Sequence, residues 1–171
     1  MNRPEPSAHQ VVAAERTVVQ YFRHEAFAGA ERIPRQGHSG EPQGIRGVPF
    51  TTVQVKHPDD PLQPWITSLL RRRDATGDPF CLLVVQSEGK EPEFWDAYLP
   101  PMWELECANE PCPEQEAWTW TRMDLRLAVA HLSSAIRIWG WAKMYALEAE
   151  KTPTVSGIQA WISAARLQRS R

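Results

Sequence analysis

The segment 121–150 most restricts the fold of this chain, because its apolar side chains recur at α-helical spacing on two sides. One stripe contains Leu125, Val129, Leu132, Ile136 and Trp139. A second stripe contains Leu127, His131, Ile138, Trp141 and Tyr145. Thr121 and Asp124 have capping-box spacing, which predicts that the helix begins at Thr121. A helix that is apolar on two sides is usually covered by two partners, so we predict a long buried helix near residues 121–150 at the centre of the fold.

The rest of the chain predicts further helices and a small sheet. Ser7, Asp60 and Thr152 have the chemistry of N-caps, and each precedes apolar residues at helical spacing. Alternating or continuous apolar runs predict strands at 50–57, 80–85, 93–99 and 102–107. The fold class is therefore α+β, with about four helices packed on a mostly antiparallel sheet of three to four strands.

We expect a single domain over residues 1–171, since a chain of this length can bury one core. Residues 1–6 are predicted to form a loose tail. Residues 31–49 contain four glycines and three prolines without a period, which predicts a long loop.

Net charge and cysteine content indicate the cellular compartment and the classes of binding partner that we expect. The net charge of -2 gives no overall attraction to nucleic acid or to anionic membranes. The 3 cysteines, an odd number, argue against a secreted disulfide scaffold. No leader with an apolar core and no membrane-length apolar run is present in the sequence. We predict a cytoplasmic protein that does not bind membranes.

The sequence contains no convincing catalytic constellation, so a non-enzymatic protein without a metal or cofactor is predicted. Cys107 and Cys112 form one loose pair, whereas a structural zinc site usually shows two tight pairs. His131 lies on an apolar stripe, where a buried, hydrogen-bonded histidine is the common case.

One short pattern favours an enzyme instead. Pro58-Asp59, followed by Glu88-Gly89-Lys90, loosely resembles the PD-(D/E)xK nuclease pattern. That resemblance implies two carboxylates holding a divalent ion and a lysine steadying the attacking water. In that family the Glu-x-Lys lies within a strand, whereas here it falls in a predicted turn. A metal-dependent nuclease is therefore the third of three hypotheses.

Tryptophan leads to the first hypothesis, because the chain has 8 of these residues and aromatic side chains anchor protein interfaces. Trp118 and Trp120 are predicted to share a face in extended chain, and Trp95 and Trp103 lie on the alternating strands 93–99 and 102–107. Acidic residues near them predict a negative rim that attracts a basic partner: Asp96, Glu104 and Glu106. We therefore predict a protein-binding module, namely an adaptor, an inhibitor or an accessory subunit of a larger complex.

The second hypothesis is a single-stranded nucleic-acid-binding accessory protein. Its candidate phosphate contacts are five arginines: Arg71, Arg72, Arg73, Arg166 and Arg169. Exposed aromatic rings would stack on unpaired bases. The overall negative charge argues against this hypothesis, since nucleic-acid-binding modules are generally basic.

Overall fold

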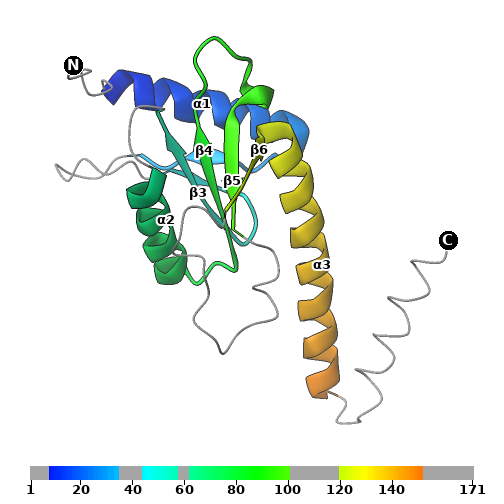
Figure 1. Ribbon diagram of the computed structural model, residues 1–171. Helices are drawn as coiled ribbons and strands as arrows, with labels where there is room; N and C mark the ends of the chain where they lie inside the picture. Colours follow the sequence, from blue (N-terminus) through cyan, green and yellow to red (C-terminus); the bar gives the residue numbers. More distant parts are fainter. Residues whose placement is uncertain (1–7, 35–43, 58–61, 101–119, 152–171) are drawn as a thin grey trace. The chain divides into compact units, whose positions relative to one another are not determined.

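The computed structural model describes residues 8–34, 44–57, 62–100 and 120–151 (Figure 1). These ranges form α1 (Ala8–Glu25), β1 (Glu31–Arg32), β2 (Ile45–Arg46), β3 (Thr51–Lys56), α2 (Leu62–Thr76), β4 (Phe80–Val85), η1, a short 3-10 helix (Pro92–Phe94), β5 (Asp96–Leu99), β6 (Thr121–Asp124) and α3 (Leu125–Lys151). The chain divides within α3 into two compact units, residues 1–133 and 134–171. A single domain over the whole chain stays a prediction.

The strands form one six-stranded sheet in the order β1-β2-β3-β4-β5-β6. Neighbouring strands are antiparallel except β3 and β4, which are parallel and are connected through α2. The predicted α+β class is confirmed, but the sheet is larger than the three to four strands expected and is mixed. The described ranges contain three α-helices instead of about four. The sequence pattern missed β1 and β2 because each is only two residues long, too short for an alternating pattern.

The centre of the first unit is β4, whose six residues are all buried. Its apolar run was predicted as a strand covered on both faces. Cys81, Leu83 and Val85 form a core with the inner face of α2, which includes Trp65 and Leu69. Helix α1 packs against β3 and covers the other side of the sheet (Figure 1). The first unit is therefore built from a sheet between two helices.

The predicted central helix is not the buried centre of the fold. In α3 the side chains of Leu125, Val129 and Leu132 are buried, which confirms the first stripe at its start. The second stripe is exposed at His131 and at Ile138. The correction has a simple cause: spacing places residues on one face of a helix but does not determine whether another element covers that face. Among the described helices, α3 included, none combines the length and the hydrophobicity needed to cross a bilayer.

The predicted capping box at Thr121 is also wrong. Residues Thr121–Asp124 form β6, which pairs with β5 in antiparallel register, and α3 begins at Leu125. The backbone N–H of Leu125 donates a hydrogen bond of 2.9 Å to the carbonyl oxygen of Trp95. Pairing with β5 therefore satisfies backbone groups that an isolated segment would have satisfied within a helix.

Residues 31–49 are not one continuous loop. Glu31 and Arg32 pair with Arg46 and Ile45, so the two ends of the predicted loop form an antiparallel pair of short strands. Three other expectations lie outside the described residues: the tail 1–6, the strand 102–107 and the helix after Thr152.

Candidate functional site

The two predicted aromatic anchors that the structure describes are buried. Trp95 is 4% exposed, and its ring N–H donates a hydrogen bond of 3.1 Å to the carbonyl oxygen of Lys90. Trp120 is 6% exposed and belongs to the core beneath α2. Both rings are inside the first unit, so neither is exposed as a surface anchor in this fold. Trp103 and Trp118 lie outside the described residues.

The acidic rim is neutralised at the position that the structure describes. Asp96 accepts two hydrogen bonds from the guanidinium of Arg122, at 3.0 and 2.8 Å, across strands β5 and β6. This bidentate pairing compensates the charge of Asp96, so Asp96 alone does not attract a basic partner. Glu104 and Glu106 lie outside the described residues.

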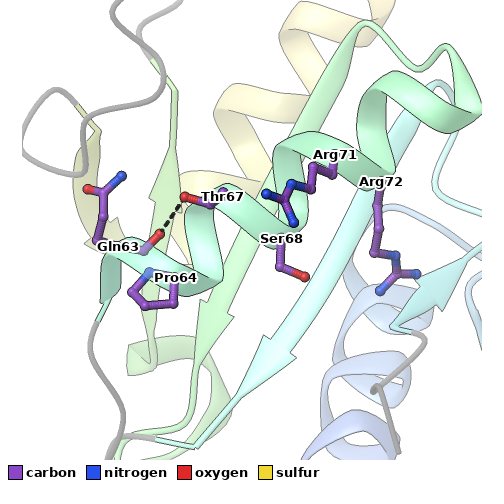
Figure 2. A pocket seen from close by; sticks show the side chains of 6 residues that line it. All are labelled: Gln63, Pro64, Thr67, Ser68, Arg71 and Arg72. Carbon is purple, nitrogen blue, oxygen red and sulfur yellow. Dashed lines mark hydrogen bonds between the residues drawn. The ribbon is translucent and has the colours of Figure 1, made fainter. Parts of the chain in front are cut away.

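The arginines of α2 do not act as one group. Arg73 forms a 3.0 Å ion pair with Asp74 and its side chain is only 18% exposed. Arg71 and Arg72 line a depression of about 410 Å³ on the outer side of α2 (Figure 2). The other residues that line it are Gln63, Pro64, Thr67 and Ser68.

The depression on α2 has the chemistry of an anion site. Guanidinium, hydroxyl and amide groups all donate hydrogen bonds to phosphate or carboxylate oxygens. The Thr67 hydroxyl is already engaged, since it donates to the carbonyl oxygen of Gln63 at 3.1 Å (Figure 2). No aromatic ring is among the described residues that line the depression, so base stacking has no platform there. Arg166 and Arg169 lie outside the described residues.

The residues proposed for a nuclease or a metal are only partly described. The ring nitrogen Nε2 of His57, just after β3, lies 3.8 Å from a carboxylate oxygen of Glu88, just after β4. Glu88 and Lys90 are exposed. Asp59, Cys107 and Cys112 lie outside the described residues, within which no three His, Cys, Asp or Glu side chains gather as a metal site. Because β3 and β4 are parallel neighbours, their carboxyl ends lie side by side, and His57 and Glu88 follow these two ends.

Among the residues that the structure describes, the most exposed large apolar side chains lie on α3. Leu127 is 48% exposed in the first unit, and Ile138 and Trp141 are 63% and 48% exposed in the second. Successive helix residues are rotated by about 100°, so Ile138 and Trp141 lie about 60° apart on one side of the helix. Arg137, which is exposed, lies about 40° beyond Trp141 on the same side of the helix. We call Ile138 and Trp141, with Arg137, the α3 face.

Comparison with protein-family models, curated proteins and solved structures returned no match. The functional argument therefore rests on the geometry of the described residues.

The α3 face is suited to binding another macromolecule. Large apolar side chains on a helix lose unfavourable contact with water when a partner covers them. The ammonium group of Lys143 lies 4.7 Å from the ring centroid of Trp139, a cation–π contact on a different side of the helix from Ile138 and Trp141. The spacing of the second stripe was the sequence signal for this surface, although it predicted burial within the chain.

Proposed function

We propose that this protein is a protein-binding module, acting as an adaptor, an inhibitor or an accessory subunit, and that its partner docks on the α3 face. The exposure of Ile138 and Trp141 at neighbouring positions of one helix carries the proposal. Single exposed hydrophobic residues are common, but a tryptophan next to a β-branched aliphatic residue and an arginine has the composition of an interface hot spot.

Burial of this pair would supply useful binding energy. A fully buried isoleucine contributes roughly 1.5–3 kcal/mol relative to an exposed one. Tryptophan buries a larger area with only two side-chain torsions to restrict. The two anchors together are worth about 3–5 kcal/mol before the costs of association, so further contacts of the interface must offset those costs.

The experiment is affinity capture from the native host, with quantitative mass spectrometry, using the full chain and the double variant Ile138→Gln/Trp141→Gln. Both positions are exposed, so the variant should fold like the wild type. We expect a defined set of partners to disappear.

The matched control for this capture is Phe50→Asn, because Phe50 is the exposed hydrophobic residue outside α3 among those described, at 42%. Its backbone φ is 55°, a conformation that asparagine tolerates. This control should keep the partners. Identical partners for the wild type and the α3 double variant would contradict the proposal.

A single-stranded nucleic-acid-binding protein is the second candidate, and the depression on α2 supports it. Arg71 and Arg72 lie side by side in sequence, and the hydroxyl of Ser68 lines the same depression. Fluorescence anisotropy with a labelled single-stranded oligonucleotide tests this candidate. It requires binding that weakens steeply with added salt and that Arg71→Gln reduces. Absence of binding at low salt would remove it.

A metal-dependent nuclease is the third candidate. The proximity of His57 and Glu88, which follow the carboxyl ends of β3 and β4, supports it. Cleavage of DNA that requires Mg²⁺ or Mn²⁺ and is lost in Glu88→Ala would favour it. Because Glu88 is exposed, the variant should fold like the wild type, and Glu93→Ala is a control in the same connection. Cleavage that both variants retain would reject it.

A further inference from the structure

We infer that the chain's own segment 152–171 occupies the α3 face before a partner binds, as a helix that runs antiparallel to α3 and that the partner must displace. The displacement rests on the proposed function, whereas the docking of the segment does not. The basis is the exposure of the α3 face, the apolar spacing of the segment, and the mirrored positions of the two sets of apolar residues.

The α3 face is an apolar stripe that the other described residues leave open. The side chains of Ile138 and Trp141 are 63% and 48% exposed. Position 145, a tyrosine, continues their spacing, so the three positions lie within about 60° of one another around the helix. The α3 face and segment 152–171 belong to the same compact unit, residues 134–171.

The sequence of segment 152–171 has the pattern of an amphipathic helix. Thr152 and Pro153 have the chemistry of an N-cap and a first turn. Apolar residues follow at positions i, i+3, i+4 and i+7: Ile158, Trp161, Ile162 and Ala165. The segment lies outside the described residues, so this helix is a prediction from the sequence. A short helix is only marginally stable in water by itself, and packing of its apolar side supplies most of its stability.

The apolar positions of the segment mirror those of α3. In a hairpin of two antiparallel helices, both rise by about 1.5 Å per residue, so positions equally far from the turn face each other. With the turn centred between residues 151 and 152, the three facing pairs are all apolar: Tyr145 with Ile158, Trp141 with Ile162, and Ile138 with Ala165. The order of spacings along α3, three and then four, is reversed along the segment, as antiparallel packing requires.

Covalent connection favours this occupant over a second copy or a separate protein. The segment follows directly on Lys151, the last residue of α3. A tethered segment is present at an effective concentration on the order of millimolar, and it loses less translational and rotational freedom on docking than a separate molecule does. The segment therefore covers the α3 face until a partner with a more favourable interface replaces it.

The mirrored arrangement also brings two cations together on one flank. Arg137 lies about 40° beyond Trp141, and Arg166 lies about 40° beyond Ile162 on the mirrored side. Like charges at neighbouring helix positions are weakly destabilising. This pair weakens the docked state and keeps it reversible, and it provides a test of the facing positions.

The first test is hydrogen exchange of the full chain, followed by mass spectrometry of peptides that cover residues 155–168. We expect exchange there to be at least about tenfold slower than in an unstructured chain. Ile138→Gln/Trp141→Gln should raise the rate by about tenfold, because the helix loses its apolar partners. Leu127→Gln, at an exposed position of α3 outside the facing pairs, is the matched control and should leave the rate unchanged.

The second test reverses charges in the same exchange experiment. Arg137→Glu and Arg166→Glu should each slow exchange by about two- to fivefold, since each converts a like pair into an opposite pair. Both changes together restore a like pair and should return the rate toward that of the wild type. Arg16→Glu, at an exposed position of α1, should have no effect. Reversals that act independently of each other would contradict the antiparallel docking.

Other results identify other occupants and overturn the inference. Fast exchange over residues 155–168 in the wild type shows that the segment is not docked. Protection that Ile138→Gln/Trp141→Gln leaves unchanged shows that the segment docks elsewhere. Protection that disappears when the protein is diluted shows that the segment comes from a second copy.

Failure of this inference is distinguishable from failure of the proposed function. Trp161→Gln/Ile162→Gln should increase the recovery of host partners in affinity capture, because it uncovers the α3 face. If host partners depend on Ile138 and Trp141 but the segment is unprotected and its variant recovers no more of them, the inference fails and the proposed function stands. If the segment docks but no host partner depends on these two residues, the proposed function fails and the docking stands.

Discussion

Replacing Gly47 with alanine should destabilise this protein far more than the same change at Gly77. Gly47 has φ of 82°, and a Cβ atom there would overlap the carbonyl oxygen of Gly29. Gly77 has a similar φ of 70°, but a Cβ atom there would meet no atom within 4 Å. The two positions therefore share the backbone cost of a left-handed residue and differ in the space available.

The magnitude follows from adding the separate effects. The left-handed conformation costs a non-glycine residue about 1–2 kcal/mol, and the reduced entropy of the unfolded chain returns about 0.4–1 kcal/mol. Gly77→Ala should therefore cost about 1 kcal/mol. At Gly47 the backbone must also move apart, which adds about 2 kcal/mol by analogy with overpacked cores, so Gly47→Ala should cost about 3 kcal/mol.

The assay is urea unfolding followed by far-ultraviolet circular dichroism and by tryptophan fluorescence. With an m-value of about 2 kcal/mol/M, the midpoint should fall by about 1.5 M for Gly47→Ala and by about 0.5 M for Gly77→Ala. Equal midpoints for the two variants would refute the close approach of Gly47 to Gly29. They would also refute the packing of the connection after β2 against the connection between α1 and β1.

Three further predictions concern buried polar groups. Arg32→Ala should lower the free energy of unfolding in urea by about 2 kcal/mol, because the side chain of Glu15, which is 3% exposed, loses its 3.4 Å ion pair. As a control, the same change in a Glu15→Gln background should cost little. Gln54→Met should add about 1 kcal/mol to the free energy of unfolding, since the buried Oε1 of Gln54 accepts no hydrogen bond from the described residues. Burial, reinforced by Asp96 and opposed by Arg122, raises the pKa of Tyr98 above 10.0, so its stabilising contribution should be lost as pH rises through that pKa and should vanish in Tyr98→Phe.

Each of these three predictions can fail clearly. An Arg32→Ala cost that Glu15→Gln does not reduce would show that the ion pair is not the cause. A less stable Gln54→Met would show that the amide has a partner or that the shape of the side chain matters more. Unchanged alkaline unfolding in Tyr98→Phe would show that other groups control stability above pH 10.

Local patterns predicted the elements whose partners are close in sequence. The apolar spacing of α1 and α2 and the unbroken run of β4 each correspond to an observed element. The buried residues of α2 recur at that helical spacing: Trp65, Ile66, Leu69 and Leu70. These patterns suffice because the backbone hydrogen bonds of a helix form within the helix itself. A continuous apolar strand is buried on both faces, so its pattern does not depend on which face is exposed to solvent.

The candidate surface was not predicted as such. The second stripe of α3 was recognised, but its exposure was not, and Trp95 and Trp120 were expected outside although they are buried. Composition describes what a side chain is suited to contact. Whether that contact lies within the chain or with another molecule depends on neighbours distant in sequence.

By itself, the sequence determined an α+β chain with a central apolar strand and the inner face of α2. Only the tertiary structure decided that residues 121–124 extend the sheet and that the middle of α3 presents Ile138 and Trp141 to solvent. The reason is the range of the interactions involved. Helical hydrogen bonds and apolar periodicity act over a few residues, whereas strand pairing and burial depend on segments that folding brings together.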